Sequence, residues 1–141
     1  MALMDMTEIE PLLETLPRLL VPGDRFVFTA QHLCFNSNAM TMVAELVDRD
    51  GELVAVNSVK LSGYLDVPPG KGAGMPGEPA AHYYFHRPLG ELLGACFRAG
   101  FVMDGIEEPA FEDKAEESSP LSWKSCRQIP PVFAARMRLV G

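Results

Sequence analysis

The sequence predicts an α/β fold. Apolar side chains recur at three- and four-residue spacing over 9–20, which is one face of a helix. Pro22 and Gly23 then give a tight turn, and Phe26-Val27-Phe28 is the aromatic and β-branched run of a strand covered on both faces. A helix, a short turn and a buried strand form half of a βαβ crossover, so we expect a parallel sheet.

The first helix is expected at roughly 7–20. Thr7 and Glu10 have the spacing of a capping box at its start, and Pro11 falls in the first turn, where a missing N–H costs least. Pro17 removes one backbone hydrogen bond and is expected to bend or shorten the helix.

An insertion of about 36–82 follows the first strand. Residues 42–47 and 53–56 flank a turn at 48–51 that ends in glycine, which predicts a β-hairpin whose second arm continues to residue 64. The run 68–77 contains four glycines and is expected to be a flexible loop; a long insertion of this kind is often a lid.

The last third of the chain predicts a helix and two strands. Pro88 begins a helix with an apolar face, Gly100 ends it, and Phe101 opens a strand. Residues 112–119 are acidic and polar, as in an exposed loop. The apolar segment 129–140 is a terminal strand in which the two prolines confine pairing to the residues after them. The order is helix, strand, insertion, helix, strand, strand.

Composition excludes several classes of function. The 141 residues make one domain or part of one, and the net charge of −7 argues against nucleic acid or an anionic membrane surface as a partner. No apolar run reaches the roughly 18 residues of a membrane span. The three cysteines have neither zinc-finger nor redox spacing, so we expect a reduced, cytoplasmic compartment and no metal site.

Three segments carry a resemblance to a known family. They are the helix–turn–strand at 18–28, the run Tyr84-Phe85-His86-Arg87-Pro88 with the helix to residue 101, and Glu107-Glu108-Pro109 followed by the final strand. In this order and spacing they resemble the class I S-adenosylmethionine-dependent methyltransferases, the small-molecule, type 11-like group. The resemblance covers nearly the whole chain. It implies a Rossmann-like sheet with a lid-like β insertion, S-adenosylmethionine as cofactor, and a small organic molecule as methyl acceptor.

The sequence departs from that family in two ways. Asp24 stands where a second turn glycine is usual, which is a small change because Asp tolerates turn geometry. The larger departure is that no glycine-rich turn follows a strand and precedes a helix. We therefore interpret 1–141 as the C-terminal portion of a methyltransferase domain. Most of the cofactor site is expected outside this chain, on a complementary N-terminal half.

The loop at 31–38 follows the C-terminal end of the first strand, where open parallel sheets bind ligands, so its place in the fold makes it the first candidate for a site. The resemblance adds the other candidate site residues. Five are expected to shape the acceptor pocket: His32, Phe35, Tyr84, His86 and Arg87. Three are expected on the cofactor side of the cleft: Ala2, Leu3 and Asp5. No catalytic residue is assigned, because the sulfonium donor is already activated and the protein mainly positions the acceptor.

Simpler roles remain open for several of these residues. His32 could be a loop histidine bonded to the backbone, Arg87 could pair with Glu91, and Asp5 could cap the first helix. The whole chain could also be a non-catalytic remnant or subunit that associates through an exposed sheet edge. A third alternative is a small-ligand binder that uses the lid without chemistry.

Overall fold

The computed structural model describes residues 2–72, 77, 79–112 and 119–141. Four residues of the predicted flexible loop at 68–77, which are 73–76, and most of the acidic loop at 112–119 lie outside the described residues. The described elements follow the predicted order of helix, strand, insertion, helix, strand and strand. Two 3₁₀ turns add to them, η1 (Ala2–Met4) and η2 (Trp123–Ser125).

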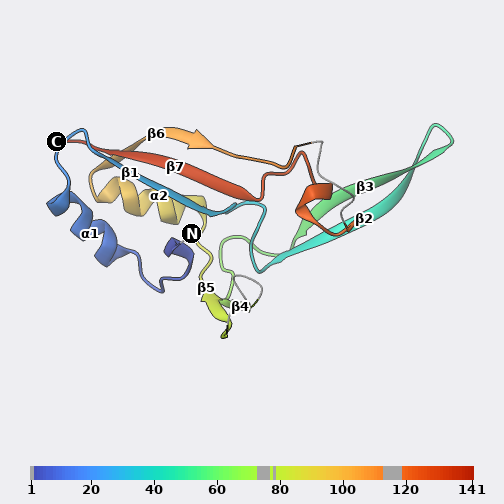
Figure 1. Cartoon of the computed structure of the whole chain (residues 1–141), viewed down its shortest axis with the longest axis horizontal. Coiled ribbons are helices and arrows are strands. Elements are labelled where there is room, and N and C mark those ends of the chain that lie inside the picture. Colours follow the sequence, from blue (N-terminus) through green and yellow to red (C-terminus); the bar gives the residue numbers. More distant parts are fainter. Residues whose placement is uncertain (1, 73–76, 78, 113–118) are drawn as a thin grey trace.

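The main sheet has three strands in the order β1-β7-β6: β1 (Arg25–Gln31), β7 (Val132–Leu139) and β6 (Phe101–Glu107). The central strand β7 is antiparallel to both neighbours, with Phe28 opposite Ala135 and Met103 opposite Met137. The prediction of a parallel sheet is therefore wrong for neighbouring strands. β1 and β6 do run in the same direction, as the crossover pattern implied, but the final strand lies between them (Figure 1).

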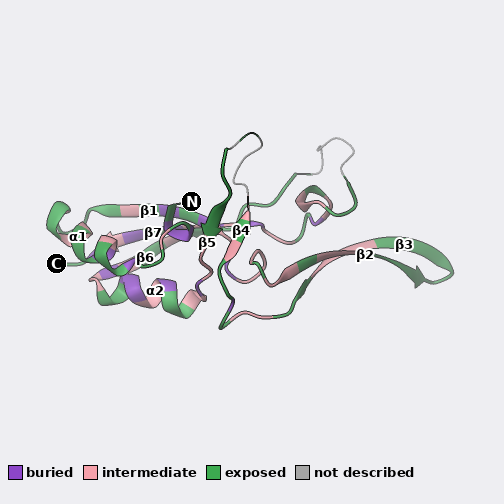
Figure 2. Ribbon diagram, turned by 90° about the horizontal axis from the view of Figure 1, so that it is seen from below, coloured by how far each residue is buried: buried purple, intermediate pink, exposed green. Residues whose placement is uncertain are grey.

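Helices α1 (Glu10–Leu19) and α2 (Leu89–Arg98) lie on one face of this sheet. Alternate β7 residues point into the core beneath them, where Phe133 and Met137 are 1% and 0% exposed. Buried residues gather between this face and the two helices in Figure 2. On the other face Val27 is 61% exposed, so β1 is covered on one side only and the expectation of two covered faces is wrong.

The open face of the sheet carries a charged cluster. Asp104 accepts a hydrogen bond from Arg136 at 2.7 Å, and Arg138 and Arg25 lie 3.5 and 3.9 Å from its second oxygen. The hydrogen bond from Arg136 lowers the pKa of the Asp104 carboxyl, with help from the charges of all three arginines. Asp104 sits at a bulge in β6, between Met103 and Gly105.

The start of α1 differs from the prediction. The N-cap residue is Ile9 and has no side-chain cap, so the Thr7–Glu10 capping box does not form. Glu10 instead accepts a hydrogen bond from the Ile9 N–H at 3.1 Å, because the helix begins three residues later than expected. Pro17 lies inside the helix, which still runs on to Leu19.

The predicted hairpin is confirmed, as β2 (Met40–Arg49) and β3 (Glu52–Leu61). Its turn uses left-handed backbone at Asp50 and Gly51, with φ of 58° and 88°, and the Gly51 N–H donates to Asp48 Oδ1 at 2.7 Å. The hairpin extends away from the three-stranded sheet (Figure 1). A second, short pair, β4 (Gly70–Gly72) with β5 (His82–Tyr84), lies between the hairpin and α2 in the sequence.

Because the Cys96 thiol is buried, we expect the folded protein to become less stable in alkaline solution. Cys96 is fully buried in α2, and burial raises the pKa of its thiol from 9.0 to about 11. Below pH 9 the thiol is neutral in both states. Between pH 9 and 11 the unfolded chain loses this proton first, so the free energy of unfolding should fall by about 2–3 kcal/mol. Urea unfolding across this pH range measures the effect, and Cys96→Ala should remove it. An equally steep loss in that variant would assign it to other groups.

Candidate functional site

The loop after β1 and the end of β6 meet at the same edge of the sheet. His32 is 3% exposed, and its Nε2 donates to Glu108 Oε1 at 2.7 Å. The other ring nitrogen, Nδ1, accepts the Cys34 backbone N–H at 3.2 Å, which places the proton of a neutral ring on Nε2. Because β1 and β6 run in the same direction, their C-terminal ends form the edge at which open α/β sheets bind ligands.

Aromatic rings hold His32 in place. Phe35 stacks on the imidazole with ring centroids 4.5 Å apart, and Phe133 meets it edge-on at 6.1 Å. Both ring nitrogens are therefore occupied and both ring faces are restricted. Glu108, by contrast, has a side chain that is 52% exposed, so a ligand at this edge would meet the carboxylate before the imidazole.

Sequence reasoning assigned Glu108 no role. The signal that could have found it is its place just beyond β6, which mirrors the place of His32 just beyond β1. The two residues are 76 positions apart, and only the strand pairing brings them together.

Arg87 holds the segment that precedes α1. Its guanidinium donates to the backbone oxygens of Leu3 at 2.9 Å, Met6 at 2.6 Å and Thr7 at 2.8 Å, and the residue is 7% exposed. Its Nε also lies 3.8 Å from Glu91, which confirms the ion-pair alternative. All of these partners belong to the protein, and the role of Arg87 toward a substrate stays a prediction.

The predicted cofactor-side residues lie on the segment that Arg87 fastens. Leu3 is 5% exposed, whereas Ala2 and Asp5 are exposed, and the Asp5 N–H closes a turn onto the Ala2 carbonyl. Asp5 does not cap α1, since that helix has Ile9 at its N-cap. The Phe85 N–H donates to the Met4 carbonyl at 2.8 Å and ties the same segment to the strand-like run before α2.

His86 and Tyr84 come just before Arg87 in the sequence. His86 Nε2 donates to the Tyr64 carbonyl at 2.8 Å, while the Tyr64 hydroxyl accepts the Leu89 N–H at 2.9 Å. The Nδ1 of His86 is buried and has no partner among the described residues. Tyr84 is half-buried in β5, opposite Gly70.

Of the predicted site residues, Ala2 and Leu3 line one cavity of the described residues, and Leu3 and Arg87 line another. The space where η1, the end of β1 and residues 85–87 meet is only about 10 Å³, so these parts are closely packed. A larger groove of about 280 Å³ runs beside the outer edge of β1. Its lining joins Ala2, Leu3, Met6 and Leu12 to the strand residues Phe26, Val27, Phe28 and Thr29. The predicted residues Ala2 and Leu3 thus share a groove with an unpaired strand edge.

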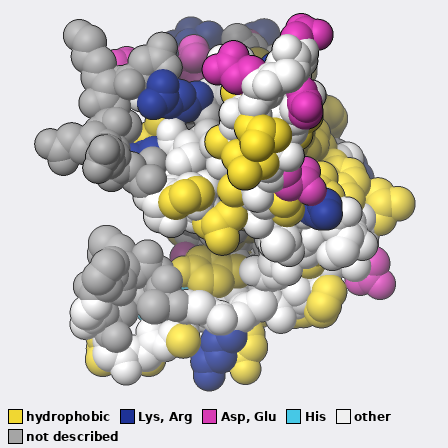
Figure 3. All heavy atoms as spheres, turned by 90° about the vertical axis from the view of Figure 1, so that its right-hand side faces the viewer, with side chains coloured by type: hydrophobic (Ala, Val, Ile, Leu, Met, Phe, Trp, Pro, Cys, Tyr) yellow, Lys and Arg dark blue, Asp and Glu magenta, His cyan; other side chains and the backbone are white. Residues whose placement is uncertain are grey.

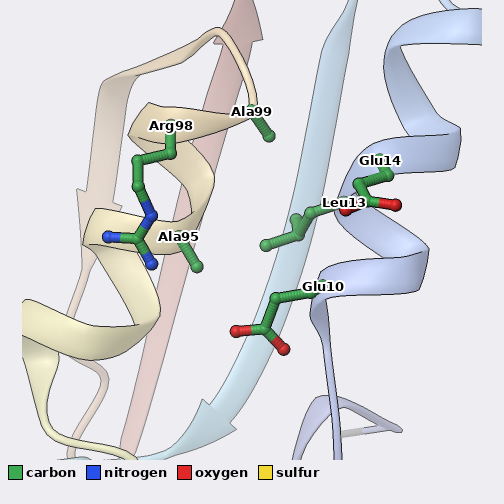
Figure 4. Close-up of a pocket in the computed structure, with 6 residues that line it drawn as sticks. All are labelled: Glu10, Leu13, Glu14, Ala95, Arg98 and Ala99. Atoms are coloured by element: carbon green, nitrogen blue, oxygen red, sulfur yellow. The ribbon is translucent and has the colours of Figure 1, made fainter.

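A third cavity, of about 170 Å³, separates the two helices. Glu10, Leu13 and Glu14 of α1 face Ala95 and Arg98 of α2, and Ala99 just after α2, across it (Figure 4). None of these is a predicted site residue, and the cavity is not at the C-terminal ends of the strands. We assign it no role in the candidate site.

The structure resembles two solved methyltransferase structures. One is an S-adenosylmethionine-dependent methyltransferase from Mesorhizobium loti, with a TM-score of 0.62 and 21% identity over 98% of this chain. The other is a proposed enzyme of the same class from Listeria monocytogenes, with a TM-score of 0.61 and 14% identity over 95% of this chain. The chain has the fold of the matching part of these methyltransferases. It spans 58% and 56% of their lengths. No protein-family profile and no curated protein matches the sequence.

The described residues offer an S-adenosylmethionine molecule an apolar surface but no site for its ribose. The groove beside β1 offers an apolar wall, and among the described residues that line it Thr29 alone has a polar side chain. None of these described lining residues is acidic, as a residue that binds ribose hydroxyls would be, and the described part of the chain contains no glycine-rich turn from a strand into a helix. We therefore derive no chemical step through the cofactor.

Two features are absent from the described residues. They contain no group of three or more His, Cys, Asp or Glu side chains placed to hold a metal ion. None of their helices has the length and apolar character needed to cross a bilayer.

Proposed function

We propose that this chain is the C-terminal, acceptor-side portion of a methyltransferase that moves a methyl group from S-adenosylmethionine to a small organic molecule. The observation that carries the proposal is the β1-β7-β6 sheet with α1 and α2 on one face, superposed over nearly its whole length on methyltransferase structures. A final strand inserted antiparallel between two co-directional strands is a specific topology, which makes the likeness more than a shared α/β class.

In this proposal the edge that carries His32 and Glu108 faces the acceptor. The exposed Glu108 carboxylate would bind or orient a polar group of the acceptor, and His32 would hold that carboxylate in place. Phe35, Tyr84 and His86 would complete the acceptor side, and Arg87 would set the position of Ala2 and Leu3. The hairpin and the short β4–β5 pair would shield the site from water as a lid.

The proposal places most cofactor contacts in an N-terminal half outside this chain. Calorimetry is expected to find no micromolar binding of S-adenosylmethionine to the 141-residue chain alone, and micromolar binding to it would contradict this division of the site. The function itself is tested on the complete gene product, including any in-frame sequence upstream of Met1. Failure of that product to bind S-adenosylmethionine would reject methyl transfer.

A second candidate function rests on the free edge of β1. In the described residues β7 is the only strand that pairs with β1, and the outer edge faces the groove lined by η1 and α1. An unpaired strand edge can accept another strand. The chain would then be a non-catalytic subunit or remnant that associates through this edge. Concentration-dependent protection of the β1 amides from hydrogen exchange would support this alternative, and unprotected β1 amides at every concentration would exclude it.

A further inference from the structure

One face of the β2–β3 hairpin is almost entirely apolar. Residues directly opposite each other in an antiparallel pair share a face, so the register divides the twenty hairpin residues into two sets of ten. One set, which we term the apolar hairpin face, comprises Met40, Met42, Ala44, Leu46, Asp48, Leu53, Ala55, Asn57, Val59 and Leu61. Eight of these ten are apolar. The other set mixes valines with Glu45, Arg49, Glu52 and Lys60, as a solvent-facing surface does.

The apolar hairpin face is open to solvent. Leu46 is 71% exposed, Leu53 68% and Leu61 46%. Within the described part of the chain, neither β2 nor β3 makes extensive contact with any helix or strand except its hairpin partner. Figure 3, which looks at the molecule from the hairpin end, shows hydrophobic side chains gathered on this side beside acidic ones. An isolated two-stranded hairpin is marginally stable in water, so a partner on this face would stabilise it.

The polar residues of the face point to a second copy of the same chain. Asn57 lies at the centre, beside Ala44, and a side-chain amide both donates and accepts hydrogen bonds, so two copies of Asn57 can satisfy each other. Asp48 is the only charged residue on the face, and it sits at the tip, where its carboxylate already accepts the Gly51 N–H. Asp48 therefore lies at the rim of a contact between two such faces and not at its centre.

We infer that two copies of this chain associate through their apolar hairpin faces, with the tip of each hairpin over the base of the other. A two-fold axis in the interface plane, across the strands, then places Ala44 opposite Ala44 and Asn57 opposite Asn57. The tips carry Asp48, Asp50 and Glu52, and each chain has a net charge of −7. This arrangement holds the two acidic tips about 30 Å apart, several times the screening length at physiological salt.

The area of the apolar hairpin face determines how strongly the two copies are expected to associate. Ten-residue strands give a face about 30 Å long, and two strands make it about 10 Å wide, so two copies cover roughly 600 Å² in total. That area is typical of a weak, transient contact and lies below the range of stable specific interfaces. The dimer is therefore weak and reversible, and its population follows protein concentration.

Sedimentation equilibrium over a range of protein concentrations tests the inference. The wild-type mass should rise from 15.5 kDa toward twice that value. Leu46→Lys places a charge on the apolar hairpin face and should keep the mass at the monomer value. Val47→Lys is the matched control, because Val47 is the next residue on the same strand, faces the other way and is 38% exposed. It should associate as the wild type does.

A cross-linking pair tests the geometry. Ala44→Cys puts a thiol next to the two-fold axis, and a short bis-maleimide reagent should join it to the same thiol of the second copy across the roughly 10 Å between stacked sheets, whereas Glu45→Cys, on the opposite face, should not be joined in this way. Three results would each overturn the inference: a wild-type chain that stays monomeric at its highest attainable concentration, equal loss of association in Leu46→Lys and Val47→Lys, or equal cross-linking at positions 44 and 45. A monomer would mean that another occupant covers the face.

The test is separable from the proposed functions. Association through the apolar hairpin face changes with Leu46 and protects β2 and β3 amides from hydrogen exchange. Association through the edge of β1 is insensitive to Leu46 and protects β1 amides instead. The outcome is also independent of whether the chain takes part in methyl transfer.

Discussion

Arg87→Ala is expected to lower the free energy of unfolding by about 3–5 kcal/mol. The guanidinium is almost fully buried and donates to the backbone oxygens of Leu3, Met6 and Thr7. Truncation removes a charged donor from all three acceptors at once and leaves a cavity, and hydrogen bonds to charged groups contribute more than neutral ones. Urea denaturation followed by circular dichroism measures the loss. A domain of this size has about 5–15 kcal/mol in all, so the variant should be close to unfolding.

Two further variants serve as controls for this measurement. Arg98→Ala removes an exposed arginine from the end of the same helix and should change stability by no more than about 0.5 kcal/mol. Arg87→Lys keeps the charge but loses the planar fork, so it should recover only part of the loss. If Arg87→Ala were as stable as Arg98→Ala, the hydrogen bonds from Arg87 to Leu3, Met6 and Thr7 would contribute nothing to the stability of the fold. Arg87 would then be available for the substrate role that the resemblance implied.

The elements of the fold were predictable where a local pattern determines them. The β2–β3 hairpin has alternating strands and a glycine turn within twenty-two residues, and its register follows from that turn. The helix α2 has a proline at its start and Gly100 after its end, with φ of 88°. Each of these signals lies within a few residues of the structure that it specifies.

The sheet was harder to predict because its order is a long-range property. The run Phe26-Val27-Phe28 correctly predicts a strand, but nothing near it shows that the last strand of the chain inserts beside it. The same run is apolar at every position although Val27 faces outward, so composition alone could not show that one side of β1 is open.

The candidate site was predicted in part. The loop after β1 was chosen for its place in the fold, and the structure puts a buried histidine there with an exposed carboxylate beside it. The carboxylate comes from the end of β6, and pairing across β7 decides which residues of β1 and β6 meet. The sequence indicated that Arg87 begins the segment before α2 but not what it binds. Its partners are backbone carbonyl oxygens, which every residue has, so no residue type in the sequence identifies them.

Phe133→Ala is expected to lower the free energy of unfolding by about 3–5 kcal/mol, the range for deleting a large aromatic side chain from a core. Phe133 is 1% exposed on the central strand, and its ring lies 6.2 Å from that of Phe28 and 6.1 Å from that of His32. Urea denaturation again measures the change. The control is Val27→Ala on the open face of the sheet, where 61% of the side chain is already in water and the loss should be below about 1 kcal/mol.

Phe133→Ala also tests how much the core contributes to holding His32 in the candidate site. Phe133 is the residue through which the core contacts His32, so its loss opens space beside one edge of the imidazole. Phe35 and Glu108 should still hold the ring from the other directions. The histidine proton resonances of Phe133→Ala should therefore shift and broaden while the chain remains folded, and Val27→Ala should leave them unchanged. Unshifted resonances in a destabilised Phe133→Ala would show that Phe35 and Glu108 alone fix the imidazole, and that the edge where β1 and β6 end is built independently of the core beneath it.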